Sequence, residues 1–404
     1  MKWPVDKPAP TLMFYVQHLL GVGHIKRASL LVKGWLEAGF DVCVVSGGEP
    51  VPLFNFDGAQ LVQLPPVKTA DAAFSALVTA EGEPLDDGFR EHRKGILLDT
   101  FAAVQPDILV IENYPFGRRQ LRWELKPLLE LASNAEKRPL IACSVRDIVQ
   151  ARKAERVAET VSLIERYFDL VLVHGDGRFV PFESSFPAAA EIAEKIRYTG
   201  YVTDSIAASD AEDGEAEGEG EVLVSSGGGA VGFGLMRAAM DGRSQTLLAE
   251  HTWRFLMGPN VPTHERAELE LGVKPGVIVE PSRPDFPALL TRCGLSISQG
   301  GYNTVMDLLV ARAPAVIVPF EGEGETEQLE RTSKLAQFGL CALVRERDLT
   351  PEAMAQAVDR AVALHPEQVD IDLQGAAHCA RLLGEALESR KTVKPENKLE
   401  TLGG

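Results

Sequence analysis

Long hydrophobic runs, paired cysteines and an excess of basic residues are all missing from this 404-residue sequence. Its longest apolar runs, such as 108–111 and 277–279, are far too short to span a bilayer. The N-terminal stretch lacks the apolar core of a signal peptide, because Asp6, Lys7 and two prolines interrupt it. We therefore expect a cytoplasmic protein, and a peripheral contact with the inner face of a membrane stays compatible with the sequence.

The charge balance and the cysteine content exclude further classes. The net charge is −17, from 41 basic and 58 acidic residues, whereas a nucleic-acid partner requires a basic face. The five cysteines are scattered and form no C-x-x-C pair, so neither a zinc site nor a disulfide framework is indicated. We expect buried free thiols, no nucleic-acid partner, no metal and no cofactor.

Two familiar nucleotide-binding motifs are also absent. The loop Gly21-Val-Gly-His24 falls short of G-x-G-x-x-G, because Lys26 stands where the third glycine would be. A second glycine-rich loop, 226–234, contains no G-K-[ST] and is therefore not a P-loop. Both loops nevertheless follow apolar strand patterns and precede helical ones.

What the sequence does contain is two long runs of alternating strand and helix patterns. Between them, an acidic and glycine-rich segment at 204–220 has almost no large apolar residue and is interpreted as a linker or mobile loop. A chain of this length also exceeds the usual size of one core. The pattern predicts α/β architecture with two doubly wound Rossmann-like domains facing a cleft, and a C-terminal helical region packing back across it. The predicted divisions are an acceptor-side domain at 1–203, a donor-binding domain at 221–390 and a polar tail at 391–404.

Individual elements can be predicted from their spacing. The first run has strand patterns at 12–16, 41–45, 106–112, 139–144 and 170–173, and the second at 221–225, 253–257, 277–280, 295–298 and 315–318. Helical patterns include 25–38, 95–104, 122–132, 152–168, 235–250, 351–364 and 371–388. The region 68–95 is polar, and within it 82–88 is interpreted as a loop. Gly39 is placed to cap the first of these helices.

The most informative stretch is 295–335. The strand pattern ends in Ser298-Gln-Gly-Gly301, and a helix pattern starts beside Asn303-Thr304, which suits a bound anion such as phosphate. The next strand leads through an acidic loop to Glu327-Gln328, where another helix opens. Asp307 could reach sugar hydroxyls, although it and the Glu327-Gln328 pair also fit as ordinary residues of helix starts.

Polar residues follow the strands of the first run as well. Histidine is the side chain best suited to proton transfer near neutral pH, so His24 is either a helix-start residue or a catalytic base. Glu112, Asn113 and Asp147 lie at strand ends, where they either shape an acceptor site or cap loops.

On these residues the sequence resembles the GT-B glycosyltransferases. More narrowly, it resembles the family that contains the N-acetylglucosaminyltransferase of peptidoglycan synthesis and the diacylglycerol glucosyltransferases. The resemblance is clearest at 295–335 and is collinear at Gly21-Val-Gly-His24 and at Ser225-Ser-Gly-Gly-Gly229. The regions between match in pattern only.

The resemblance implies a role for each matching position. His24 would be the base in the acceptor half, with Gly23 in its loop. Asp307, which stands where glutamate is usual, would contact ribose, and Arg283 lies where the family grips the nucleotide base. The remaining positions would hold the diphosphate and the donor sugar: Gly227, Gly228, Ser298, Gly300, Gly301, Asn303, Thr304, Glu327 and Gln328.

The resemblance implies an inverting, metal-independent sugar transfer from a nucleotide sugar, a UDP-sugar in this family, to a hydroxyl of a sugar, lipid or other small acceptor. The nucleotide sugar would be a substrate rather than a cofactor. Two alternatives remain open. One is an isomerase resembling the UDP-N-acetylglucosamine 2-epimerases, and the other is a non-catalytic nucleotide-sugar-binding protein.

Overall fold

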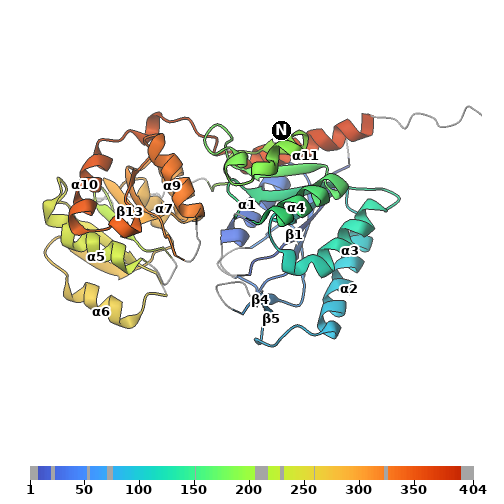
Figure 1. Cartoon of the computed structure of the whole chain (residues 1–404), viewed down its shortest axis with the longest axis horizontal. Helices are drawn as coiled ribbons and strands as arrows, with labels where there is room; N and C mark the ends of the chain where they lie inside the picture. The colour runs from blue at the N-terminus through green and yellow to red at the C-terminus, as the bar shows by residue number, and fades with distance from the viewer. Residues whose placement is uncertain are drawn as a thin grey trace, which may run out of the picture. The chain divides into compact units, whose positions relative to one another are not determined.

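The computed structural model describes residues 8–19, 23–51, 55–70, 76–150, 152–204, 217–227, 232–258, 260–322 and 326–392. The chain divides into two compact units, and each is described by itself (Figure 1). The first unit takes the chain up to Gly177, then Pro181–Val202, and then the chain from Gln374 onward. The second unit takes Arg178–Val180 and Thr203–Leu373.

The first unit is built on a seven-stranded parallel sheet with the strand order β3-β2-β1-β6-β7-β8-β9. Its strands are β1 Thr11–Val16, β2 Asp41–Ser46, β3 Gln60–Gln63, β6 Ile108–Glu112, β7 Leu140–Arg146, β8 Leu170–His174 and β9 Ile196–Tyr198. Its helices are α1 Gly23–Glu37, α2 Asp87–Val104, α3 Arg122–Ser133, α4 Ala154–Tyr167 and α11 Gly375–Thr392, with short 3-10 turns at Arg119–Leu121, Phe182–Ser184 and Pro187–Lys195. A separate antiparallel hairpin pairs β4 Val67–Thr69 with β5 Leu77–Thr79.

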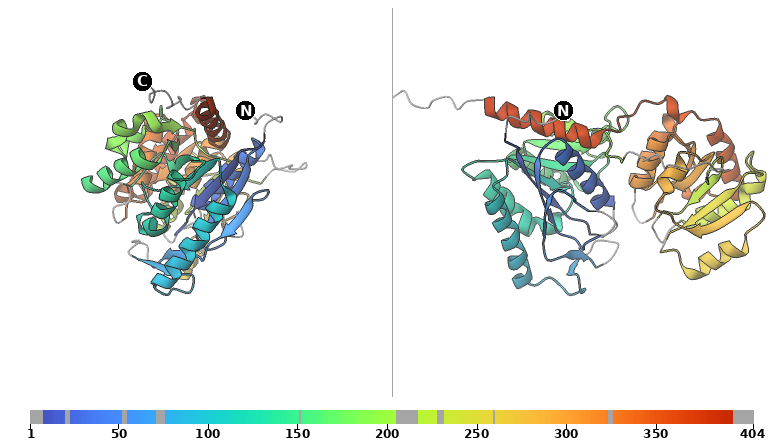
Figure 2. Two further views of the ribbon diagram at one scale, coloured as in Figure 1. Left: turned by 90° about the vertical axis from the view of Figure 1, so that its right-hand side faces the viewer. Right: turned by 180° about the vertical axis from the view of Figure 1, so that it is seen from behind.

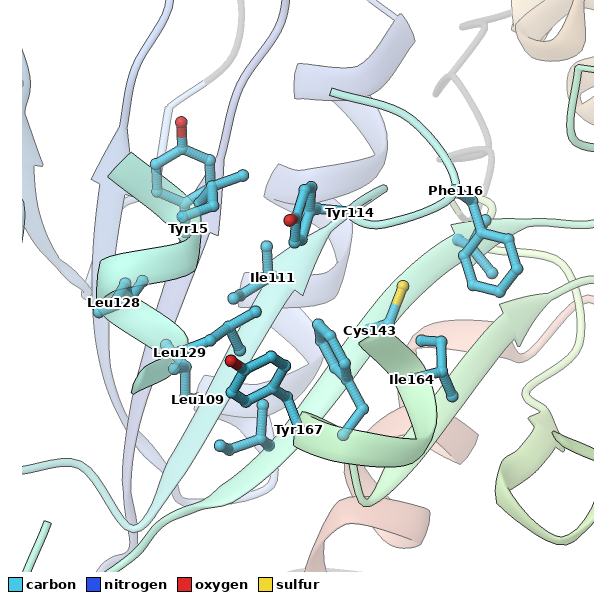
Figure 3. Close-up of a cluster of buried hydrophobic side chains, with 14 of the residues drawn as sticks. Tyr15, Leu109, Ile111, Tyr114, Phe116, Leu128, Leu129, Cys143, Ile164 and Tyr167 are labelled. Carbon is cyan, nitrogen blue, oxygen red and sulfur yellow. The ribbon is translucent and has the colours of Figure 1, made fainter. Parts of the chain in front are cut away.

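Alternation along the buried strands gives the first sheet two apolar faces. In β1, Met13 and Tyr15 belong to one core, whereas Leu12 and Phe14 belong to the other. Figure 3 shows the first of these cores, where side chains of β1, β6 and β7 meet helices α3 and α4. Each fully buried aliphatic side chain contributes roughly 1.5–3 kcal/mol, so both faces must be covered by helices.

Helix α11 covers the second face together with α1. Cys379, Ala380 and Leu383 of α11 are buried in the same core as Trp35 of α1. A Cβ on Gly34 of α1 would meet the Cβ of Ala376 at 2.9 Å, so the two helices approach closely. The right-hand view of Figure 2 shows α11, in red, running along the first unit.

The second unit has a six-stranded parallel sheet with the order β12-β11-β10-β13-β14-β15. Its strands are β10 Val222–Ser225, β11 Trp253–Met257, β12 Val277–Pro281, β13 Leu295–Gln299, β14 Ala315–Val318 and β15 Ala342–Leu343. Its helices are α5 Phe233–Gly242, α6 Thr263–Leu271, α7 Phe286–Leu290, α8 Tyr302–Ala311, α9 Glu327–Gln337 and α10 Pro351–Val362, with 3-10 turns at Arg243–Gln245, Glu346–Asp348 and Pro366–Gln368. Its core packs the sheet against α5 and α10.

The structure corrects several predicted boundaries. Helix α2 begins at Asp87 rather than at Gly95, because the side chain of Asp86 accepts a hydrogen bond from the Phe89 N–H at 2.6 Å and caps the helix. The structure also has the β4-β5 hairpin before α2, where no strand is predicted from the sequence, and α5 ends at Gly242 rather than continuing to 250.

The domain divisions also differ from the prediction. The predicted second domain ends at 390, yet α11 groups with the first unit because its apolar face packs on α1. Helix α11 also runs to Thr392, into the predicted tail, whose remainder lies outside the described residues. Of the predicted linker, 205–216 lies outside the described residues as well. Glu217, by contrast, binds the second unit through Arg254 at 2.9 Å. Across the residues that the structure describes, none of the helices is long and apolar enough to cross a membrane.

Candidate functional site

Each sheet has a switch point, where the strand order reverses about its first strand. In the first sheet β1 lies between β2 and β6, and in the second β10 lies between β11 and β13. Ligands of open α/β sheets bind outside the carboxyl ends of the strands at such points. His24 follows β1 and Glu112 ends β6, whereas Gly227 follows β10 and Gly300 follows β13. In each unit, the predicted residues therefore lie at the switch point of that unit's own sheet.

In the first unit, the imidazole of His24 is hydrogen-bonded to a buried carboxylate. Its Nδ1 lies 2.6 Å from Oε1 of Glu112, and the two side chains are 15% and 1% exposed. An ionised carboxylate only accepts hydrogen bonds, so Nδ1 carries the proton. The second ring nitrogen, Nε2, is then the one with a basic lone pair. This carboxylate–imidazole pair has the geometry of a general base held by an orienting group.

The surroundings of the pair fix its protonation. Burial of the ring lowers the pKa of His24 to about 4, against the opposing effect of the Glu112 charge. Burial by itself would raise the pKa of Glu112, but His24, Arg118 and Arg27 hold it well below its usual range. At neutral pH the pair therefore consists of a neutral imidazole and an ionised carboxylate.

Two arginines of this cluster are absent from the sequence-based predictions. Nη2 of Arg27 donates to Oε1 of Glu112 at 2.6 Å, and Nη2 of Arg118 lies 3.9 Å from Oε2. Arg27 follows His24 by three residues, so both side chains lie on one face of α1. That spacing is the only sequence signal for Arg27, because its partner Glu112 is 85 residues away.

A buried network holds the start of the segment that connects β1 to α1, the helix of His24. Oε1 of Gln17, the first residue after β1, accepts from Nη2 of Arg93 at 2.8 Å. Nε of Arg93 donates to Glu124 at 2.8 Å, and both side chains are fully buried. Tyr15 donates to the same carboxylate at 2.5 Å. Arg118 also binds this loop, since its Nε donates to the carbonyl of Gln17 at 2.8 Å.

The other predicted acceptor-side residues serve the backbone in this structure. Asn113 has a φ of +63°, and its N–H donates to the carbonyl of Ser144 at 2.7 Å. Asp147 is buried, and its Oδ2 accepts from the hydroxyl of Tyr201 at 3.1 Å. Gly23 is the first residue of α1. Oδ1 of Asp147 also accepts from the Ile148 N–H at 2.9 Å, as the loop-capping alternative for Asp147 expects. An acceptor-site role for Asn113 and Asp147 stays a prediction.

In the second unit, three loops converge at the switch point. A Cβ on Gly300 would lie 2.7 Å from Oγ1 of Thr332 and 3.4 Å from Cβ of Gln328, both on α9. A Cβ on Gly232 would lie 2.9 Å from Cβ of Ser226 and 3.4 Å from Cδ of Gln299. The loop after β10, the end of β13 and the start of α9 are therefore in contact. Gly227 has a φ of +66°, which favours glycine.

The start of α8 has features that suit an anion. Gly301 is its N-cap, with Asn303 and Thr304 in the first turn and Asp307 further along the helix. No acidic residue occupies that first turn, so the positive end of the helix dipole is left for a ligand. Behind it, the Ser298 hydroxyl is buried and makes no hydrogen bond within the described residues.

Helix α9 begins at Glu327, as predicted. Oε1 of Glu327 binds Nη2 of Arg331 at 3.0 Å, and Arg331 is buried over the ring of Tyr302 at 5.1 Å. Oε1 of Gln328 accepts from the N–H of Phe320 at 3.0 Å and so fixes the loop after β14. Gln328 thus fixes the loop after β14, and Glu327 binds the arginine that packs on the first residue of α8.

Arg283, predicted to lie near the nucleotide base, is enclosed by carboxylates. Its guanidinium donates to Asp285 at 2.9 and 2.8 Å and to Glu217 at 2.9 Å, and Glu280 lies 3.5 Å away. Arg254 joins the same network. The Arg283 side chain is 26% exposed, and its contact with a nucleotide base stays a prediction.

The remaining predictions concern Gly228 and metal binding. Gly228 lies outside the described residues. A D-x-D spacing does occur at Asp370-Ile-Asp372, but Asp370 faces Arg178 at 3.5 Å. Among the described residues, no group of three or more His, Cys, Asp or Glu side chains is arranged to hold a metal ion.

Comparison with known sequences supports the prediction for the second unit. Residues 227–373 match the glycosyltransferase family 28 C-terminal domain. The UDP-N-acetylglucosamine–N-acetylmuramyl-(pentapeptide) pyrophosphoryl-undecaprenol N-acetylglucosamine transferase of Brucella canis is 30% identical over 161 residues, which cover 33% of this chain and 42% of that protein. The enzyme of the same name from Thermotoga neapolitana is 30% identical over 90 residues, covering 22% and 26%. The chain thus spans less than half the length of these curated relatives.

Comparison with solved structures covers nearly the whole chain. The calicheamicin glycosyltransferase CalG4 superposes with a TM-score of 0.63 at 16% identity, over 96% of this chain and 100% of its own. MurG of Acinetobacter baumannii superposes with a TM-score of 0.59 at 14% identity, over 94% and 100%. These likenesses concern the fold and confirm the predicted class. The chain therefore has the GT-B fold of the glycosyltransferases, and its residues 227–373 match the glycosyltransferase family 28 C-terminal domain.

Proposed function

We propose that the protein transfers a sugar from a nucleotide-diphosphate donor, a UDP-sugar, to an acceptor hydroxyl, with inversion at the anomeric carbon and without a metal. One observation carries the proposal: a neutral imidazole, His24, is oriented by the carboxylate of Glu112 in a GT-B chain whose second unit matches a family 28 domain. A base of this kind is what an acceptor hydroxyl needs before it attacks.

In this proposal, Nε2 of His24 takes the proton of the acceptor hydroxyl as its oxygen attacks the anomeric carbon. Glu112 stabilises the imidazolium that forms. The bond from the anomeric carbon to the diphosphate breaks, and the nucleoside diphosphate leaves with the electron pair. The N-terminus of α8 and the backbone amides near Gly227, Gly300 and Gly301 would stabilise that charge.

The relatives suggest where to begin with substrates. The name of the Brucella canis protein specifies UDP-N-acetylglucosamine as donor and a pyrophosphoryl-undecaprenol acceptor. We propose a UDP-hexose or UDP-N-acetylhexosamine as donor and a lipid-linked acceptor, met through peripheral contact with the inner face of a membrane. A cytoplasmic location follows from the same proposal.

A thermal-shift screen of UDP-, TDP-, GDP- and ADP-sugars tests the donor. A ligand at a hundredfold excess over Kd adds about 2.7 kcal/mol to the stability of the folded state. The selected donor is then incubated with and without lipid acceptors, and UDP release is measured in the presence and absence of EDTA. Sugar transfer that is unchanged by EDTA, with the inverted linkage seen by NMR, supports the proposal. Rearrangement of the donor sugar without acceptor would identify an epimerase instead, and failure of every nucleotide sugar to bind would refute the proposal.

A further inference from the structure

Arg27 shares one carboxylate oxygen with the proposed base. Its Nη2 donates to Oε1 of Glu112 at 2.6 Å, and Nδ1 of His24 lies 2.6 Å from the same oxygen. The arginine side chain is 2% exposed, and its Nη2 is 3.4 Å from Nδ1 of His24. Charge-assisted hydrogen bonds of this length are among the strongest in proteins. The three side chains therefore form one buried unit that spans α1 and the end of β6.

We propose that Arg27 is a positioning residue for sugar transfer, which holds the Glu112 carboxylate against His24 and limits the proton affinity of the imidazole. This inference rests on the proposed role of His24 as the base. It goes beyond that role because it assigns a function to a cation that itself takes no proton and touches no reacting atom.

The orienting part of the role follows from the two oxygens of Glu112. Oε1 accepts from both His24 and Arg27, whereas Oε2 is buried and accepts no hydrogen bond from the described residues. Nη2 of Arg118 lies 3.9 Å from Oε2. Without Arg27, Oε1 loses one of its two hydrogen-bond donors, and the His24 ring is left as the donor that fixes the carboxylate. Arg27 thus helps to fix the position of the carboxylate beside His24.

The electrostatic part follows from the charges around the ring. Arg27 lies on the helix of His24, Arg118 follows β6 and Arg146 ends β7; the last two already oppose protonation of His24. Glu112 alone favours it. His18 after β1 and His174 on β8 are buried, which lowers the pKa of both, to about 3 for His174, so they carry no charge at neutral pH. Removing Arg27 leaves the carboxylate less compensated and favours the imidazolium.

The test compares Arg27→Gln with Arg27→Lys, which retains the charge. Lys33→Gln is the matched control, because it removes a positive charge from an exposed position of the same helix, about 9 Å further along the axis. The titration of the His24 ring is followed by NMR in the free protein, with the His24→Gln spectrum to assign the signal. This readout needs neither donor nor acceptor.

We expect the ring to titrate near pH 4 in the wild type and in Lys33→Gln. In Arg27→Gln its midpoint rises by about one to two pH units, as expected for the loss of a close charge at an effective dielectric constant of about 20. Arg27→Lys stays within about half a unit of the wild type. With substrates, Arg27→Gln lowers kcat by about tenfold or more, leaves KM for the donor within about twofold, and moves the acid limb of the rate profile to higher pH.

An unchanged midpoint in Arg27→Gln would overturn the proposal, because a merely structural arginine lowers activity without moving the titration. An equal rise in Arg27→Lys would overturn it too, since the charge would then be irrelevant. If Arg27→Gln does not fold, Arg27→Lys is still informative: its midpoint must stay within about half a unit of the wild type, and a rise of about one unit or more would overturn the proposal. A raised midpoint in a protein that transfers no sugar would refute the proposed function and leave the charge effect of Arg27 standing.

Discussion

The substitution Gly300→Ala tests how the donor half of the molecule is built. A methyl group at this position would lie 2.7 Å from Oγ1 of Thr332, about 0.7 Å inside ordinary van der Waals contact, which begins at 3.4 Å. Thr332 is fully buried, and Cγ2 of Ile317 closes the other side at 3.4 Å. Overpacking of this kind costs about 1–3 kcal/mol. The strain falls on the strand-to-helix turn before α8, so UDP affinity should fall with stability.

The assay is a double-mutant cycle with Thr332→Ala, measured by urea unfolding and by calorimetric titration with UDP. The Thr332 hydroxyl makes no hydrogen bond within the described residues, so its removal costs little and opens the space that the new methyl group needs. We expect the double variant to recover at least 1 kcal/mol of stability, roughly, and most of the UDP affinity. Two results would refute the geometry of this turn. One is that the stability changes of the two single variants add up, to within about 0.5 kcal/mol, to that of the double variant. The other is a Gly300→Ala variant as stable as the wild type.

Three further predictions concern the first unit. Glu112→Gln removes a negative charge beside the imidazolium of the transition state. The attraction between two unit charges at about 4 Å and an effective dielectric constant of about 20 is about 4 kcal/mol. Losing it should lower kcat, measured as UDP release, by about 10³. The pKa of His24 is about 4 in the folded protein and about 6.5 in the unfolded chain. The wild type therefore loses about 3 kcal/mol of stability as the pH falls from about 6.5 to about 4. Urea unfolding of His24→Gln should show a loss that is smaller by about this amount. Arg93→Met leaves the buried Glu124 carboxylate without its cation and should lower the free energy of unfolding by about 3–5 kcal/mol.

Each of these has a matched control. Glu159→Gln neutralises a carboxylate that is 42% exposed and paired with Arg119, and it should leave UDP release unchanged. Equal pH dependence of stability in the wild type and His24→Gln would contradict a neutral, buried imidazole. Replacing Arg93 and Glu124 together by Met and Leu should recover much of the stability lost in Arg93→Met, and a further loss would show that the pair is not the main interaction.

Local patterns were sufficient for much of the fold. Strand β1, helix α1 and the positive φ of Gly39 follow from apolar spacing and a terminal glycine, and α9 begins at the predicted Glu327. The start of α2 was missed because Gly88 and Gly95 weaken its helical pattern, and the cap at Asp86 outweighs them. These errors concern boundaries, which local propensities define poorly.

Long-range partners were not accessible from the sequence in the same way. The periodicity of α11 shows that one face is apolar but not that α1 is its partner, more than 300 residues earlier in the chain. The partners of Arg283 include Glu217, 66 residues away, which no local pattern indicates. Local patterns likewise give no indication that Arg27 contacts Glu112, because 85 residues separate the two.

The position of α11 has a consequence for how the protein is made. The chain leaves the first unit at Val202 and returns at Gln374, and a β-bridge pairs these two residues. Thr203 and Leu373, the ends of the intervening segment, are joined by a hydrogen bond of 3.0 Å. During translation the second unit therefore emerges in full before the helix that covers α1 has been synthesised. The unit that begins first is completed last. A stop codon after Leu373 would remove α11 from the first unit while leaving residues 227–373, which match the family 28 domain, in place.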